Sequence, residues 1–284
     1  MSFLYNLTFS LSLGDLKNHV LVDVKVMDLS HSIKEIIVNN SVGKFCVSLS
    51  GGVDSMCLLH ALHSLLKENT HFLDITALHI NYNNRDNTDN EVSFVQNFCD
   101  KLSIKLNVLH ILDIKRTKQH RAKYEEYTRK LRFEAYSKEN CPIFLGHNFD
   151  DTVENIISNI SSCKKYENLK GMSKISHERN VQTLRPFLDI PKSQIYAYAD
   201  THNIPHLQDS TPKWSRRGKL RDHVIPCLME HEPNFVSGLL SLCKDLAQNY
   251  TFIQQNPNSL SLPPNILNAK QYLTNKCISH SLKS

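Results

Sequence analysis

The sequence predicts an α/β fold, a doubly wound and mostly parallel β-sheet with helices on both faces and a small helical C-terminal extension. Short apolar runs alternate with longer helical patterns from Lys44 to about residue 205, and this alternation implies the right-handed crossovers of a parallel sheet. The motifs with chemically reactive side chains all follow the apolar runs, and ligands collect at the carboxyl ends of such strands. A chain of 284 residues, of which 40% are hydrophobic, is long enough for one such domain plus extensions.

The first predicted strand is Phe45–Leu49, a short apolar run that ends at the turn signal Ser50-Gly51-Gly52. A helix is expected to open at Asp54, because leucines follow at helical spacing: Leu58, Leu59, Leu62, Leu65 and Leu66. By the same reasoning, further strands are predicted over Ile75–Ile80, Ile104–Ile111, Pro142–Leu145 and Val181–Leu184. The helices predicted between and after them are Asn90–Leu102, Tyr124–Lys138, Asp150–Ile160 and Pro191–Asn203.

The domain organisation is expected to follow this alternation. Residues 1–40 are predicted to be an irregular N-terminal extension, and residues 41–205 to form the main domain. Residues 206–250 are expected to hold a basic segment, Lys213–Arg221, and a helix over His223–Gln248. Residues 251–284 form the expected C-terminal tail, which is rich in Asn, Ser, Leu and Pro.

The charge and the cysteine content indicate the kind of partner and the compartment, and they do not indicate the reaction. Lys and Arg outnumber Asp and Glu by 33 to 28, and the net charge of +5 leans mildly towards polyanionic partners. The eight cysteines form no CxxC pair, which favours free thiols in a reducing compartment. With no recognisable secretory signal or membrane-spanning segment, we expect no membrane partner and a cytoplasmic location, an organelle or a virus being the other settings considered.

The loop after the first strand reads SGGVDS and is suited to bind phosphate. Gly51 and Gly52 allow a sharp turn and a close approach of the backbone to a ligand. The amides at the start of the following helix would stabilise an anion, and Asp54 could bind Mg²⁺. The loop lacks the Lys-Ser/Thr pair of a Walker A motif, which argues against a kinase-like or GTPase-like protein. The structural alternative is an ordinary strand-to-helix turn with a capping residue.

A second motif, GHNFDDTVE, follows the predicted strand Pro142–Leu145. It places His147 and three acids, Asp150, Asp151 and Glu154, at a strand end and on the first turns of a helix. Acids at this position also favour the helix dipole, which explains part of the pattern. Such a cluster could hold Mg²⁺, receive an amine or accept a proton from it.

These two motifs, in this order, resemble signatures of known enzymes. The SGGVDS string resembles the PP-loop of ATP pyrophosphatases, and GHNFDDTVE resembles the GHxxDDxxE segment of tRNA lysidine synthetases and thiolases. Between Lys44 and Leu228, further segments resemble motifs of the tRNA(Ile)-lysidine synthetase family at the expected spacing. Their residues are His79 with Asn81 and Arg85, Arg129 with Arg132 and Phe133, Arg185 followed by Pro186, and Arg216 with Arg221.

The resemblance implies an adenine nucleotide α-hydrolase-like PP-loop fold, with residues 41–205 as the ATP-binding catalytic domain. It implies a ligase that uses ATP and Mg²⁺ to adenylate the wobble cytidine of tRNA(Ile), after which free L-lysine displaces AMP. ATP would contact Ser50, Gly51, Gly52, Val53, Asp54, Ser55 and His79, and Mg²⁺ would contact Asp54 and Asp151. The catalytic residues would be Asp54, His147, Asp150, Asp151 and Glu154. tRNA or phosphate would contact Arg85, Arg129, Arg132, Arg185, Arg216 and Arg221.

The alternatives are a tRNA thiolase of the same superfamily and a PP-loop module that binds nucleotide or RNA without turnover. Thiolases use paired cysteines, which this chain lacks as a CxxC motif, although Cys141 and Cys163 flank the acidic motif. The chain departs from the lysidine synthetase pattern at Tyr82, which replaces a His. It also departs at Arg217 and Gly218, which resemble a one-residue insertion where an Asn is usual. Partners considered are tRNA, free lysine and a second copy of the chain in a homodimer.

Overall fold

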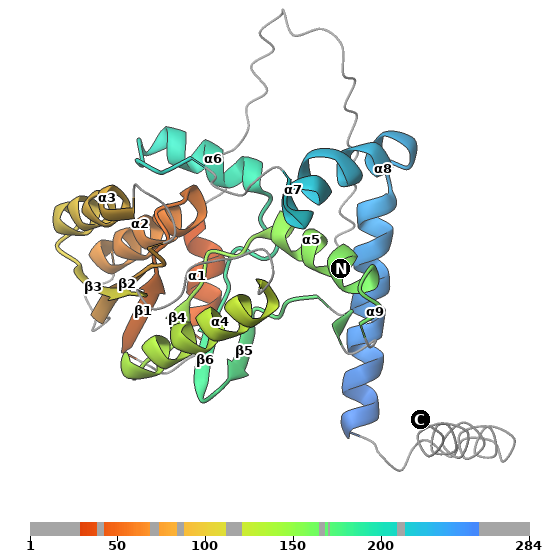
Figure 1. The fold of residues 1–284 in the computed structure, drawn as a ribbon, viewed down its shortest axis with the longest axis horizontal. Coiled ribbons are helices and arrows are strands. Elements are labelled where there is room, and N and C mark those ends of the chain that lie inside the picture. The colour runs from red at the N-terminus through yellow and green to blue at the C-terminus, as the bar shows by residue number, and fades with distance from the viewer. Residues whose placement is uncertain are drawn as a thin grey trace, which may run out of the picture.

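The computed structural model describes residues 29–38, 43–68, 74–83, 88–111, 121–164, 168–169, 171–208 and 214–255. It contains a six-stranded sheet in the order β3-β2-β1-β4-β6-β5 (Figure 1). The strands are β1 (Lys44–Ser48), β2 (Asp74–Asn81), β3 (Lys105–His110), β4 (Ile143–Phe144), β5 (Ile175–Glu178) and β6 (Val181–Leu184). All neighbouring pairs are parallel except β5 with β6, which confirms the mostly parallel sheet.

The strand order reverses between β1 and β4. From β1 the chain winds outward through β2 to β3, and it then returns to β4 on the other side of β1 before reaching β6. β1 and β4 pair directly, with Cys46 opposite Ile143 and Val47 opposite Phe144. The two loops that leave these strands therefore open at the same edge of the sheet, which is where doubly wound proteins bind ligands.

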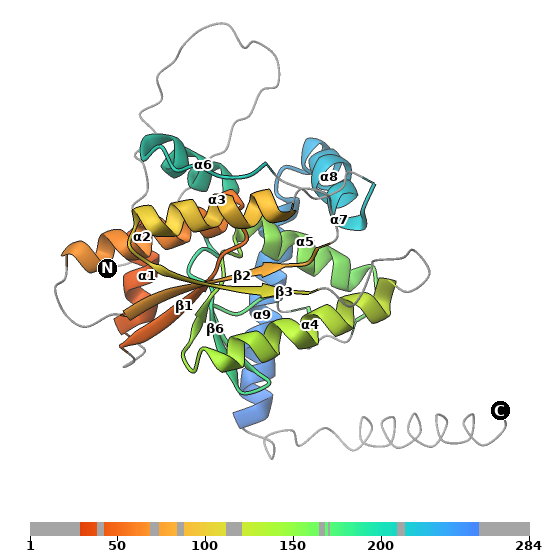
Figure 2. The same ribbon diagram turned by 60° about the vertical axis from the view of Figure 1, so that its left-hand side comes forward.

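Helices cover both faces of the sheet (Figure 2). The helices that belong to the larger core are α1 (Leu29–Val38), α2 (Val53–Glu68), α3 (Thr88–Lys101) and α6 (Lys192–Thr201). α4 (Arg121–Lys138) packs on the opposite face. The side chains of β1 alternate accordingly, because Phe45 and Val47 enter the larger core while Cys46 enters the smaller one.

The expectation that residues 1–40 are irregular is wrong for Leu29–Val38, which form helix α1. Leu29, Ile33 and Ile36 of this helix are buried, and they belong to the same core as α2. They stand at positions i, i+4 and i+7, which is the spacing of an amphipathic helix. The helix therefore packs as part of the described core.

Strand β5 is absent from the sequence-based prediction. It pairs antiparallel with β6 through a two-residue turn at Arg179 and Asn180, whose φ angles of 49° and 62° are typical of a tight hairpin. Only part of its side-chain surface is buried, so its sequence, ISHE, lacks a continuous apolar run. The hairpin forms one edge of the sheet.

The C-terminal region is helical but is divided differently from the prediction. α7 (Arg216–Lys219), the π-helical turn η3 (Leu220–Val224) and α8 (Ile225–His231) follow one another directly, so the helical backbone begins before His223. The predicted single helix is broken at Glu232–Asn234, because Pro233 lacks an amide hydrogen and restricts the residue before it. α9 (Phe235–Gln255) then continues beside α5 (Phe149–Ile160) (Figure 1).

Within the described ranges, no helix combines the length and the apolarity needed to cross a membrane.

Candidate functional site

The loop Ser50–Ser55, here called the glycine loop, connects β1 to α2 and is tied together by short hydrogen bonds. The Ser55 hydroxyl donates to the Gly52 carbonyl at 3.0 Å and accepts from the Ser50 amide at 3.1 Å. Gly51 has a φ of 83°, and a Cβ added there would lie 2.8 Å from Cδ1 of Leu207. The amides of the first turn of α2 have no acceptor within the helix, because helical hydrogen bonds start one turn later. The loop thus presents backbone N–H donors at the point where the strand order reverses between β1 and β4.

Asp54 lies at the first turn of α2 and is held by two neighbours. Asn148 donates its side-chain amide to Oδ1 of Asp54 at 2.9 Å, and Nζ of Lys192 lies 3.5 Å from Oδ2. Burial raises the pKa of the Asp54 carboxyl above its ordinary value, while Lys192 and Asn148 oppose that shift. The carboxylate is therefore partly buried, and a nearby positive charge stabilises its ionised form.

The start of α5 is fixed next to the glycine loop. Asn148 caps this helix, because its side chain accepts from the Asp151 amide at 3.0 Å while Oδ2 of Asp151 accepts from the Asn148 amide at 3.1 Å. Gly146, just before, packs so closely on α2 that an added Cβ would lie 3.0 Å from backbone atoms of Asp54 and Ser55. Asn148 therefore joins the two motifs, since it contacts both Asp54 and Asp151.

Asp151 and Glu154, here called the acid pair, lie three residues apart on α5 and face two arginines. Arg217 binds Oδ1 of Asp151 and Oε2 of Glu154, and Nε of Arg221 donates to Oε1 of Glu154 at 2.6 Å. Burial would lower the pKa of Arg217, but the acid pair outweighs burial and raises it. The acid pair is spaced by three residues and the two arginines by four, and both spacings place side chains on one face of a helix. α5 therefore meets α7 and the adjoining turn η3 through two acids and two arginines.

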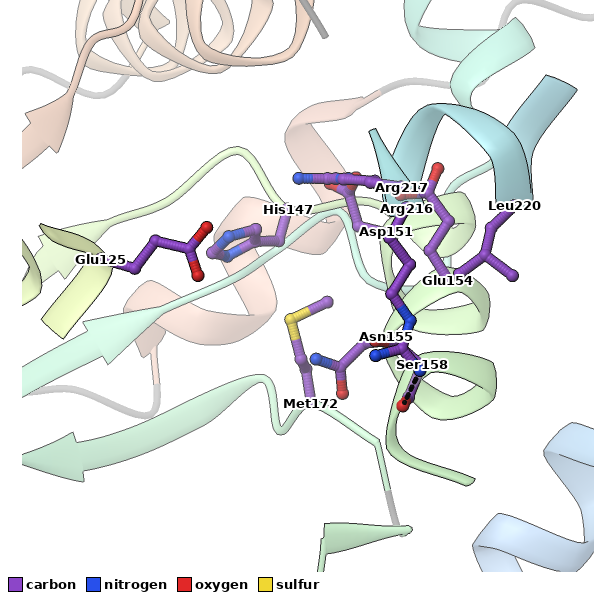
Figure 3. Close-up of a pocket in the computed structure, with 10 residues that line it drawn as sticks. All are labelled: Glu125, His147, Asp151, Glu154, Asn155, Ser158, Met172, Arg216, Arg217 and Leu220. Atoms are coloured by element: carbon purple, nitrogen blue, oxygen red, sulfur yellow. Dashed lines mark hydrogen bonds and ion pairs between the residues drawn. The ribbon is translucent and has the colours of Figure 1, made fainter. Parts of the chain in front are cut away.

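The acid pair lines a cavity of about 560 Å³ between α4, α5 and α7 (Figure 3). Glu125 of α4 lies on the far side of His147 from Asp151, and Met172 lies below the imidazole (Figure 3). The complete lining is Glu125, His147, Asp151, Glu154, Asn155, Ser158, Met172, Arg216, Arg217 and Leu220. The cavity is rich in charged and amide groups, which suits a polar substrate rather than an apolar one.

His147 is half-buried at the wall of this cavity and contacts Arg185. Nε of Arg185 donates to Nδ1 of His147 at 3.2 Å, and the other end of the guanidinium donates to Ser173 O and Ser176 Oγ at 3.1 and 2.8 Å. Burial lowers the pKa of His147 to about 4, Asp151 opposes that shift, and Arg185, Arg217 and Arg132 add to it. The imidazole is therefore uncharged at neutral pH.

The model of the PP-loop domain matches residues 26–228. The chain belongs to the PP-loop domain family. A tRNA(Ile)-lysidine synthase of Staphylococcus aureus strain COL is 29% identical over 216 residues, which cover 73% of this chain and 49% of the relative. The protein of the same name from Chlamydia trachomatis serovar L2 (strain 434/Bu) is 33% identical over 222 residues, which cover 75% of this chain and 66% of the relative.

Among solved structures, the U34-tRNA thiolase NcsA from Methanococcus maripaludis with its [4Fe-4S] cluster matches with a TM-score of 0.62. The match covers 78% of both chains at 17% identity, so it shows a shared fold and nothing finer. The comparisons confirm the PP-loop fold and the resemblance to lysidine synthetases. The chain spans about half the length of the Staphylococcus relative that it matches.

Some of the residues predicted from the sequence lie elsewhere in the PP-loop domain. Asp150 accepts from the Lys192 amide at 2.8 Å and so caps α6, outside the cavity lining. His79 is buried on β2 and contacts the Leu49 carbonyl through Nδ1 at 2.8 Å, and burial lowers its pKa. Both residues stabilise the surroundings of the glycine loop, and no contact of theirs with the acid pair is seen.

The predicted arginines fall into distinct groups. Arg185 and Arg221 are bound to side chains of the site, as described above. Arg129 pairs with Glu178 on the hairpin, and Arg216 donates to Ser158 O and to the hydroxyls of two serines near the end of α5. The Nε atom of Arg132 is buried without a hydrogen-bond partner. Arg85 lies outside the described residues.

Three residues of the site were missed by sequence analysis as contributors: Asn148, Lys192 and Arg217. Asn148 stands inside the GHNFDDTVE string at the position before a helical pattern, which is a capping signal. In the sequence, Arg217 resembles part of an insertion, whereas the structure brings it, and not Arg216, to the acid pair. Nothing in the sequence around Lys192 indicates its approach to Asp54.

The side chains of the site suit a Mg²⁺ ion that is shared with a phosphate group. Mg²⁺ is usually held by one or two carboxylates together with substrate phosphates, and Asp54 stands beside the donors of the glycine loop. Among the described residues, no group of three or more His, Cys, Asp or Glu side chains is placed to hold a metal. Asp151, the other predicted ligand, has Oδ2 on the Asn148 amide and Oδ1 on Arg217. Both oxygens of Asp54 also have partners, Asn148 and Lys192, but Asp54 lies beside the donors of the glycine loop, where an ion shared with a phosphate would be held.

Proposed function

We propose that the chain is the catalytic PP-loop portion of a tRNA(Ile)-lysidine synthetase, which adenylates the wobble cytidine of tRNA(Ile) and joins lysine to it. The observation that carries this proposal is the contact of Asn148 with both Asp54 and Asp151. Asn148 thereby joins the glycine loop to the acid pair at the point where the strand order reverses between β1 and β4. The matched relatives that are named tRNA(Ile)-lysidine synthase support the substrate assignment.

The glycine loop is proposed to bind the phosphates of ATP. Its backbone donors and the first turn of α2 would stabilise the charge of the departing pyrophosphate. Mg²⁺, when bound at Asp54, would supply further positive charge at the phosphates. Lys192 is placed to stabilise the same carboxylate or, after moving, a phosphate oxygen.

The acid pair is proposed to receive the amine of free lysine. The pair already binds a cation in this structure, because Arg217 contacts both carboxylates. A lysine ammonium has the same charge and would share or replace those contacts. Attack on the adenylated cytidine requires the amine to lose a proton, and a carboxylate of the pair is proposed to accept it.

The tRNA is proposed to approach across α7 and the open side of the cavity. Arg216 is exposed there, and Trp214 beside it has 65% of its surface exposed, which suits contact with phosphates and bases. The thiolase alternative gains no support from the cavity, since no cysteine is among the described residues that line it. We therefore prefer an amine to sulfur as the nucleophile.

Incubation of the purified chain with Mg²⁺-ATP, bulk tRNA and radiolabelled lysine tests the proposal. Label is expected in acid-precipitated RNA, and it should resist mild alkali, which strips ester-linked amino acids but leaves a carbon–nitrogen bond. The Glu154→Gln variant serves as the matched control and should incorporate no label. RNA-dependent pyrophosphate release without lysine label would refute lysine as the nucleophile while keeping the adenylation step.

A further inference from the structure

The contact between Arg185 and His147 determines which nitrogen of the imidazole carries a proton. A guanidinium Nε–H can only donate, so the Nδ1 atom of His147 that it contacts at 3.2 Å must accept. A neutral imidazole with an accepting Nδ1 carries its hydrogen on Nε2. Arg185 also donates to Ser173 and Ser176, and these hydrogen bonds fix its guanidinium where it contacts His147.

We propose that Arg185 is a positioning residue that fixes His147 as the Nε2–H tautomer, so that His147 acts in the cavity as a neutral hydrogen-bond donor and not as a base. The inference rests on the proposed function for the identity of the substrate, but the tautomer itself can be observed without any substrate. It assigns to His147 a role opposite to proton removal. The acid pair then remains as the proton acceptor.

Burial and the neighbouring arginines favour the neutral ring that this assignment requires. Arg185 at the end of β6, Arg217 of α7 and Arg132 of α4 all disfavour the positively charged, doubly protonated ring, and Asp151 of α5 favours it. Burial lowers the pKa of the ring most, and the three arginines lower it further, so the ring is uncharged at neutral pH although Glu125 also lines the cavity beside it. Because Nδ1 is turned to Arg185, Nε2–H is the group left for the cavity that His147 lines. A donor surrounded by guanidinium groups is suited to an oxygen atom of the substrate, not to an ammonium.

The tautomer is tested by two-bond ¹⁵N–¹H correlation spectra of the full chain labelled with ¹⁵N-histidine at neutral pH. The His147→Gln variant assigns the signal by its loss. We expect one set of His147 resonances with a protonated Nε2 and an unprotonated Nδ1. In Arg185→Gln, whose amide can donate or accept, a mixture of tautomers is expected, whereas Arg185→Lys should keep the wild-type pattern. A wild-type ring protonated on Nδ1, or on both nitrogens, would overturn the proposal.

The donor role is tested by activity in the lysine-incorporation assay. His147→Gln places an amide N–H near the position of Nε2 and should keep activity within about 10-fold, whereas His147→Asn should lose about 100-fold or more. Equal loss in both variants, with a folded His147→Gln protein, would contradict the donor role. If the wild type incorporates no lysine, the proposed function fails while the spectra still decide the tautomer, so the two failures are distinguishable.

Discussion

At the scale of single residues, the site combines groups that are costly to bury with partners that compensate them. Asp54 is stabilised by Asn148 and Lys192, and the acid pair by Arg217 and Arg221. Such arrangements are common at functional sites, where charged groups are kept for chemistry at the expense of stability. At some of these positions, a substitution should therefore lower the activity while it raises the stability of the fold.

Asp54→Asn should abolish pyrophosphate release without lowering thermal stability. The pKa of Asp54 is raised in the folded chain, so the native state binds its proton more tightly than the unfolded state. The ionised carboxylate thus disfavours folding, the stability that depends on its proton is lost as the pH rises through the raised pKa, and a neutral amide should leave Tm equal or higher. Calorimetry and a pyrophosphate assay on the same preparation measure both effects. Full turnover in the variant would remove Asp54 from the reaction.

Arg217→Met should destabilise the fold by about 1–2 kcal/mol, less than the loss of a fully buried partner, because Arg221 still compensates Glu154. The side chain of Glu154 is only 4% exposed, whereas that of Arg217 is 50% exposed. Urea unfolding of Arg217→Met, Glu154→Gln and the double variant gives the coupling free energy. The neighbouring Arg216→Met is the matched control, with an expected change under about 0.5 kcal/mol. A coupling near zero would contradict the predicted stabilisation of the fold by the contact between Arg217 and Glu154.

At the scale of secondary-structure elements, the site depends on how closely α2, α5 and α7 meet the ends of β1 and β4. The main strands and helices of the core were predictable, because apolar periodicity reports burial directly. α1 is also detectable from the spacing of Leu29, Ile33 and Ile36, which the prediction of an irregular segment does not take into account. The contact of α7 with α5 was not predictable, since a π-helical turn at Leu220–Val224 determines the helical phase of Arg221 relative to Arg217.

Two glycine substitutions should have opposite effects on the free energy of unfolding. Gly146→Ala would place a Cβ 3.0 Å from backbone atoms of Asp54 and Ser55, so α2 must shift, and we expect a loss of about 1–3 kcal/mol. Gly238→Ala in α9 meets nothing within 4 Å and should stabilise by about 0.5–1 kcal/mol. Gly146→Ala should also reduce pyrophosphate release at least 10-fold, while Gly238→Ala keeps it. An active and fully stable Gly146→Ala protein would contradict the close packing.

At the scale of the whole molecule, a net charge of +5 attracts RNA only modestly. The effect of a single phosphate contact on tRNA affinity should therefore be measurable. Arg216→Gln should weaken tRNA binding and reduce the slope of log affinity against log salt by about 1 if Arg216 contacts a phosphate. Arg179→Gln, at the hairpin turn away from the cavity, is the matched control and should leave the slope unchanged. Equal slopes in both variants would exclude Arg216 from the tRNA interface.

The most direct measurement is the stoichiometry of the complete reaction, counted in one tube from labelled ATP, labelled lysine and tRNA. Adenylation followed by attack of an amine predicts one pyrophosphate and one AMP released for each alkali-stable lysine joined to the RNA. Asp54→Asn should abolish all three products, whereas Glu154→Gln should abolish the lysine product. Lysine incorporation without pyrophosphate release, or incorporation that survives both substitutions, would contradict a single site built from the glycine loop and the acid pair.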